Sequence, residues 1–236
     1  MKVLALDTAT ENCSVALLID DRLLAGELEL KLGHAERILP MIEELLSEAG
    51  LTLSGVAAIA FGQGPGSFTG VRLAATVTQG LAFGASLPVV PVSDLRAVAQ
   101  RAFGMDPSLT RVIVCNDARM SEVYWGCYER GPDGLARLHG EEHVSKPTEV
   151  RLPASWPTAS PVGRGFVVYG DALLEALPTV ARPQELLIKL LPRAAEIALL
   201  AAPAVTAGQV LPPEAAIPVY LRDNVAHVAQ PRKTPH

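Results

Sequence analysis

Three short apolar runs open the chain, and alternating helical and extended segments follow them, an order that few folds accommodate. The runs cover Lys2–Leu6, Ser14–Ile19 and Leu23–Leu30, with the polar turn Asp20-Asp21-Arg22 between the last two. The pattern then predicts a helix over about 35–49, a strand at Val56–Phe61, a helix over Phe68–Phe83, a strand at Val89–Val92 and a helix capped by Ser93. Pro40 fits the first helix only in its first turn. This βββαβαβα order predicts a mixed sheet covered by helices.

The same order partly restarts after the break at residues 104–108. Strands are expected at Arg111–Asn116, Glu122–Tyr128 and Leu135–Glu142, and helices near Ala172–Leu177 and over Ala194–Ala202. The repeat predicts an α/β protein of duplicated actin-like (ASKHA, ribonuclease H-like) architecture, with one lobe at 1–104 and the other at 105–236. The second lobe carries 15 of the 19 prolines. We therefore expect shorter elements there, and least order in 151–164.

Composition narrows the classes of function. The 236 residues carry a net charge of −5 with 5% aromatic residues and no run of Lys or Arg, which disfavours direct binding of RNA. The longest apolar stretch, Ile197–Val205, is too short to span a membrane, and Pro203 should break it. The three cysteines, Cys13, Cys115 and Cys127, form no metal or disulfide motif, and the N-terminus lacks the apolar core of a signal peptide. We expect a soluble cytoplasmic protein.

A glycine-rich loop, Phe61-Gly62-Gln63-Gly64-Pro65-Gly66-Ser67, links a buried strand to the second helix. Such a loop can cradle phosphate at a helix start, or it can be a tight turn only. The sequence lacks the Lys of a P-loop and the spacing of a nucleophile elbow. If the loop bound metal-ATP, the candidate nucleotide-binding residues would be Asp7, Thr8, Thr10, Gly62, Gly64 and Gly66. His34 has no second histidine at a metal-binding spacing, and no metal ligands are expected.

The two N-terminal helices carry more apolar surface than one sheet requires. Between Phe68 and Phe83 the only charged residue is Arg72. A helix without a charged outer face is either buried in the core or covered by another protein. We favour a helix–helix protein interface, with these partner-binding candidates: Ile38, Ile42, Leu45, Gly70, Ala74, Thr78 and Leu81.

Several segments resemble the TsaB family of bacterial threonylcarbamoyladenosine biosynthesis proteins. The resemblance spans the chain and rests on residues 1–10, His34–Pro40, Gly62–Arg72, Asp117–Met120 and Pro218–Arg222. It implies an actin-like paralogue of the catalytic subunit TsaD. Together with TsaD and the ATPase TsaE, such a protein supports formation of N6-threonylcarbamoyladenosine next to the anticodon of tRNAs that read codons beginning with A.

The resemblance also implies a scaffold rather than an enzyme. TsaD carries a His-x-x-x-His metal pair on the helix after the strand equivalent to Val89–Val92, whereas this chain reads Ser93-Asp94-Leu95-Arg96-Ala97-Val98 there. We therefore expect a non-catalytic subunit without a cofactor that binds TsaD and TsaE, contacts tRNA only through the complex, and forms a homodimer when alone. The alternative is an ATP-dependent enzyme with its own metal-ATP site at Asp7, Thr10 and the Gly62–Gly66 loop.

Overall fold

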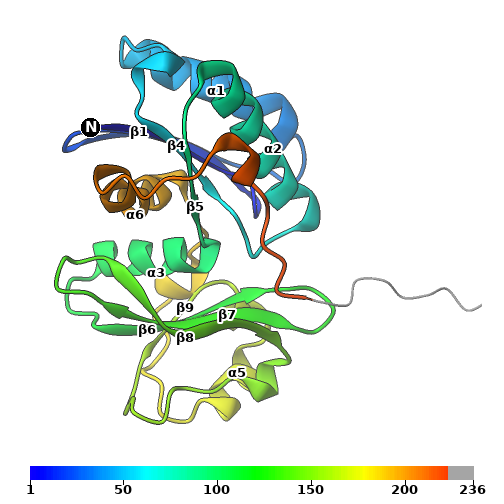
Figure 1. Cartoon of the computed structure of the whole chain (residues 1–236). Coiled ribbons are helices and arrows are strands. Elements are labelled where there is room, and N and C mark those ends of the chain that lie inside the picture. Colours follow the sequence, from blue (N-terminus) through cyan, green and yellow to red (C-terminus); the bar gives the residue numbers. More distant parts are fainter. Residues whose placement is uncertain (223–236) are drawn as a thin grey trace, which may run out of the picture.

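The first sheet contains the five strands that the N-terminal pattern predicts. A computed structural model of the chain describes residues 1–222 (Figure 1). The order is β3-β2-β1-β4-β5, with antiparallel pairing among the first three strands and parallel pairing from β1 through β4 to β5. The elements of this part are β1 (Lys2–Asp7), β2 (Asn12–Ile19), β3 (Arg22–Glu29), α1 (His34–Glu48), β4 (Ala58–Gly62), α2 (Phe68–Ala85), β5 (Val89–Val92) and α3 (Asp94–Met105).

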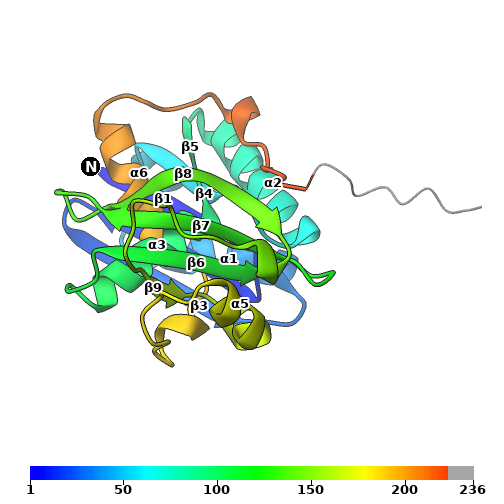
Figure 2. The ribbon, with the colours of Figure 1, turned by 90° about the horizontal axis from the view of Figure 1, so that it is seen from below.

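The second sheet repeats this topology with one strand fewer. Its order is β8-β7-β6-β9, with β6, β7 and β8 antiparallel and β9 parallel to β6 (Figure 2). The elements are β6 (Arg111–Asp117), β7 (Val123–Arg130), β8 (Ala136–Ser145), β9 (Ser160–Val162), α4 (Gly165–Val168), α5 (Gly170–Ala176) and α6 (Ala194–Thr206), with single 3-10 turns at Leu53–Gly55, Pro147–Glu149, Leu187–Lys189 and Pro213–Ala215. The duplicated actin-like fold is confirmed.

The molecule is built in five layers (Figure 1). Helices α1 and α2 cover the outer face of the first sheet, α6 and α3 lie between the two sheets, and α4 and α5 cover the second sheet. One apolar core joins both sheets through α3 and α6, and smaller cores lie under α1 and α2 and under α4 and α5. Burial of apolar surface in the central layer therefore stabilises both sheets together.

The division into lobes at residue 104 stays a prediction, and the two central helices complicate it. Helix α6 comes from the C-terminal part of the chain but packs on β1 and β2 of the first sheet. Helix α3 ends the N-terminal part but packs on β6, β7 and β8. Each half of the chain thus contributes one helix that packs on the sheet of the other half.

Two local expectations, both about prolines, were wrong. Pro40 lies inside α1, in its second turn, because the helix begins at His34. Pro203 likewise lies inside α6, which runs on to Thr206. The proline-rich segment 151–164 is mostly outside helices and strands, as its prolines favour, but it contains β9 and places Trp156 in the core under α5. Among residues 1–222, no helix has the length and apolar character needed to cross a membrane.

Candidate functional site

The glycine loop packs tightly on the turn between β1 and β2. A Cβ atom at Gly66 would lie 2.5 Å from the Ala9 carbonyl oxygen, and one at Gly70 would collide with the Thr8 carbonyl oxygen. The Thr8 hydroxyl donates to the Gly70 carbonyl across 2.7 Å. Glycine is therefore required here because the loop touches its own chain.

The N–H groups of Gly64 and Ser67 in this loop already have acceptors within the protein. Gly64 N–H donates to Asp94 Oδ2 at 2.6 Å, and Ser67 N–H donates to the Ala9 carbonyl at 2.7 Å. Ser67 Oγ caps α2 by accepting from Gly70 N–H at 3.1 Å. A phosphate group needs free N–H donors and space in front of them, and the N–H groups of Gly64 and Ser67 are not free for one.

The candidate nucleotide residues are also mostly withdrawn from the surface. Asp7, Thr8, Gly62 and Gly64 are buried, and only Thr10 and Gly66 are partly exposed. Within residues 1–222, no group of three or more His, Cys, Asp or Glu side chains is arranged to hold a metal ion.

Asp7 at the end of β1 faces Asp94 at the start of α3, a neighbour that the sequence analysis missed. Burial raises the pKa of Asp7 to about 6, against a partial opposing effect of the Ala9 N–H that donates to Oδ1 at 2.9 Å. Burial, and then the charge of Asp7, raise the pKa of Asp94 well above its ordinary range. The two acids are far apart in the sequence, and the fold brings them together by placing the end of β1 beside the start of α3.

Most of the partner-binding candidates lie on the inner sides of α1 and α2, against the first sheet. Six of the seven are buried within the chain itself, and Leu81 is partly buried; the six are Ile38, Ile42, Leu45, Gly70, Ala74 and Thr78. The stripe of small residues on α2 exists because α2 approaches β1 and β4 closely. Small residues allow close approach either by the protein's own sheet or by a partner helix. The stripe alone therefore does not indicate which side of α2 is exposed.

The opposite side of α2 is exposed and almost free of charge. The exposed or half-exposed residues of α2 between the ends of the helix are Thr69, Arg72, Leu73, Thr76, Val77, Gln79, Gly80, Leu81, Phe83 and Gly84. The side chain of Phe83 is 57% exposed. On α1 the corresponding surface carries Leu39 among acidic residues. We call these two exposed sides, of α1 and α2, the outer helix face.

Residues 210–222, named the strap here, cross from the first sheet to the second alongside α2 (Figure 1). Val89 and Leu211 exchange two backbone hydrogen bonds of 2.8 and 2.9 Å, and Val219 N–H donates to the Gln63 carbonyl at 2.7 Å. Arg72 stacks on Phe68, 3.6 Å from the ring centroid, and its Nε donates to the Tyr220 hydroxyl at 2.7 Å. These contacts hold the strap beside the outer helix face.

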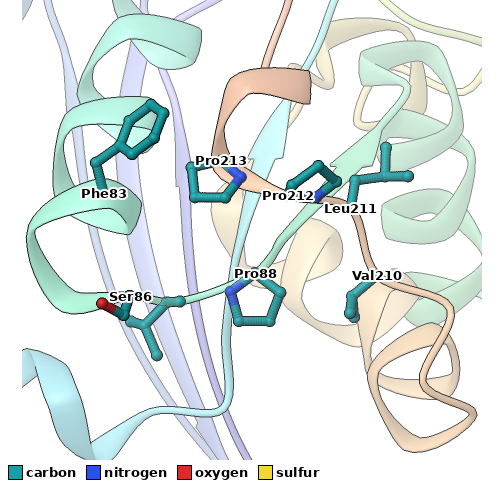
Figure 3. A pocket seen from close by; sticks show the side chains of 8 residues that line it. Phe83, Ser86, Pro88, Val210, Leu211, Pro212 and Pro213 are labelled. Carbon is teal, nitrogen blue, oxygen red and sulfur yellow. The ribbon is translucent and has the colours of Figure 1, made fainter.

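An apolar groove of about 520 Å³ lies where α2 ends and the strap begins. Figure 3 shows Phe83 and Ser86 on one side and Val210, Leu211, Pro212 and Pro213 on the other, with Pro88 at the base. The groove continues the uncharged surface of α2 toward β5.

Sequence comparisons decide the family. The chain is 42% identical over 240 residues to the tRNA threonylcarbamoyladenosine biosynthesis protein TsaB of Escherichia coli, covering 99% of this chain and 100% of that protein. This chain belongs to the TsaB family. The TsaB protein of Haemophilus influenzae is 44% identical over 72% of this chain and 75% of its own length.

The wider relationships agree with TsaB-family membership. Residues 29–230 match the family described as TsaD: tRNA N6-adenosine threonylcarbamoyltransferase. The solved structure of YeaZ from Pseudomonas aeruginosa superimposes with a TM-score of 0.82 at 44% identity, covering 93% of this chain and 99% of that one. The helix position at which the resemblance locates the histidine pair of TsaD is occupied here by Ser93, which caps α3, and by buried Asp94.

Proposed function

We propose that this TsaB-family chain is a non-catalytic subunit that binds and activates a TsaD-type catalytic subunit through its outer helix face. Its role is in forming N6-threonylcarbamoyladenosine on tRNA, the pathway for which its relatives are named. The observation that carries the proposal is the exposed side of α2, on which Arg72 is the single charged residue. An apolar surface of this kind on a separate soluble protein marks a site for another protein.

The composition of the outer helix face supports a protein partner over tRNA. The exposed part of α1 carries one basic residue, Arg37, and four glutamates, so mainly acidic residues border the apolar centre; the glutamates are Glu36, Glu43, Glu44 and Glu48. An apolar centre with a charged rim is typical of protein interfaces, whereas tRNA phosphates require a basic surface. In this proposal tRNA is contacted through the complex, with TsaE as a further protein partner in the cytoplasm.

Two structural features support a scaffold role over a catalytic one. The glycine loop is packed on its own chain, and Ser93 and Asp94 replace the metal-binding histidines that the resemblance implies for TsaD. The rival function, an ATP-dependent enzyme acting through Asp7 and Thr10, would require this loop to open. Calorimetry with Mg-ATP on the isolated protein tests the rival, for which binding with release of phosphate would be decisive.

The interface is tested by Thr76→Arg at the centre of the exposed side of α2. Because Thr76 is exposed, the variant should fold as the wild type does but lose co-purification with TsaD, since burying a guanidinium in an apolar interface is unfavourable. Threonylcarbamoyl transfer to tRNA, reconstituted with TsaD and TsaE, should fall in parallel.

Thr148→Arg is the matched control, because it makes the same change at an exposed threonine beyond the second sheet. It should leave complex formation and transfer intact. A Thr76→Arg protein that still binds TsaD would remove α2 from the interface.

The same face should mediate a homodimer when TsaD is absent. Sedimentation of the isolated chain should then give a dimer that Thr76→Arg converts to a monomer and that Thr148→Arg leaves unchanged.

A further inference from the structure

A pair of buried acids lies beneath the glycine loop, and the proposed partner interface does not use it. Asp7 and Asp94 are fully buried, and the structure places each in a pair with the other. Between them lies Gly62, where a Cβ atom would lie 2.5 Å from Asp7 Oδ1 and would also collide with Asp94 Oδ1. Two carboxylates in one enclosed space repel each other unless a proton or a cation lies between them.

The hydrogen bonds around the pair leave two acceptor oxygens without a donor. Asp7 Oδ1 accepts from Ala9 N–H, and Asp94 Oδ2 accepts from Gly64 N–H. Among the described residues, Asp7 Oδ2 and Asp94 Oδ1 are buried without any partner. One proton between the two carboxyl groups would satisfy both oxygens, because a protonated carboxyl group donates to a carboxylate.

Among residues 1–222, the charged groups that act on the pKa values of the pair are acidic and not basic. The titratable groups facing the pair are Cys13 from β2 and Glu142 from β8, and the charge of Glu142 raises the pKa of Asp94 further. Glu142 itself accepts from the hydroxyls of Ser93 and Tyr128. Arg96, one turn into α3, directs its Nε to the Ala136 carbonyl at 2.8 Å.

We propose that Asp7 and Asp94 share a single proton over Gly62, and that this bridge fastens the loop from which α2 begins. Asp94 holds the loop from both directions, because its N–H also donates to the Gly64 carbonyl at 2.9 Å. The strap binds the same loop through Gln63. The bridge thus connects the end of β1, the start of α3 and the base of α2, and its loss would loosen all three together.

The bridge has a defined pH dependence. The folded protein retains the proton at pH values where an unfolded aspartate, with a pKa near 3.9, has lost it. Its contribution to stability is therefore complete below about pH 4 and is lost as pH rises through the raised folded value. Stability should fall, not rise, as pH increases across this range.

Carbon-13 NMR of the aspartate carboxyl carbons in the full chain tests the proposal directly. One carboxyl group should keep the chemical shift of a protonated acid at pH 6, and both Asp94→Asn and Asp7→Asn should abolish this signal. Asp117→Asn, the same change at the acid that ends β6, should leave the signal in place. Ordinary titration of every aspartate in the wild-type protein would overturn the proposal.

Thermal unfolding provides the second measurement. The amide that Asp94→Asn introduces can accept from Gly64 N–H and donate to Asp7 without a titrating proton. Asp94→Asn should therefore keep a midpoint near the wild-type value at pH 5 and lose the decline seen between pH 5 and 8, whereas Asp94→Ala should melt several degrees lower throughout. Equal losses in the Asn and Ala variants would contradict the shared proton. A rise in the wild-type midpoint on adding Mg²⁺ or Ca²⁺, absent in Asp94→Asn, would show that a cation occupies the position instead.

Discussion

Two buried threonine hydroxyls, those of Thr8 and Thr78, have opposite effects on stability because only one of them is hydrogen-bonded. The Thr8 hydroxyl donates to the Gly70 carbonyl and ties β1 to α2. The Thr78 hydroxyl is buried on the inner side of α2, and no partner for its Oγ1 exists among residues 1–222. A buried polar group without a hydrogen bond lowers stability, and a bonded one supports it.

Thr78→Val and Thr8→Val should therefore shift stability in opposite directions. The first replaces a hydroxyl that lacks a partner with a methyl group and should raise the free energy of unfolding by about 1 kcal/mol. The second removes a donor from a buried carbonyl and should lower it by about 1–2 kcal/mol. Denaturant unfolding of the two variants checks this, and a loss of stability in both would show that valine does not fit at position 78.

At the scale of the element, α2 has two different sides, each containing glycine. Gly70 lies against the Thr8 backbone, whereas the position of a Cβ atom at Gly80 has no neighbour within 4 Å. Gly70 serves close packing of the helix on its sheet. Gly80 lies on the outer helix face, where a glycine in mid-helix only weakens an isolated subunit.

Gly70→Ala and Gly80→Ala make the same change on the two sides. Gly70→Ala should lower the free energy of unfolding by about 2–3 kcal/mol, because the added methyl group collides with backbone. Gly80→Ala should raise it by up to about 1 kcal/mol through higher helix propensity. Chemical denaturation of the isolated chain measures both changes, and a neutral Gly70→Ala would mean that α2 can move away from β1.

The sequence predicted the elements of the first lobe well, since each has a strong local pattern. The hairpin of β2 and β3, the strand β5 and the Ser93 cap follow from alternation, apolar runs and capping chemistry. The sequence pattern did not predict strand β9, because this strand has only three residues and contains Pro161, which is typical of a loop. Two further features could not be predicted from the sequence, namely which side of α2 is exposed and the Asp7–Asp94 pair. Both depend on contacts between segments that are far apart in the sequence.

At the scale of the whole molecule, the central layer makes the two sheets depend on each other. Ile197 in α6 is fully buried in the core that also contains residues of both sheets. Separate unfolding of either half would expose this core, so the chain should unfold as one cooperative unit.

Two sets of side chains can follow the two halves separately. Both tryptophans, Trp125 and Trp156, lie on or beside the second sheet, whereas buried Cys13 lies in the first. Tryptophan fluorescence and thiol labelling of Cys13, located by mass spectrometry, should give the same denaturation midpoint. Ile197→Ala should lower the free energy of unfolding by about 2–4 kcal/mol and move both midpoints together. Separated midpoints would mean that the halves are independent.

The borders of the two sheets limit how this protein can associate. Leu211 is paired with the outer edge of β5, and Leu187 accepts a hydrogen bond from Gly163 just beyond β9. The other edge strands expose charged side chains, Arg22, Glu27 and Glu29 on β3 and Arg137 and Glu141 on β8. Such borders discourage the strand-to-strand stacking that produces fibrils. The covered and charged edges of both sheets should therefore hinder growth into cross-β polymers, although the outer helix face remains open to other proteins.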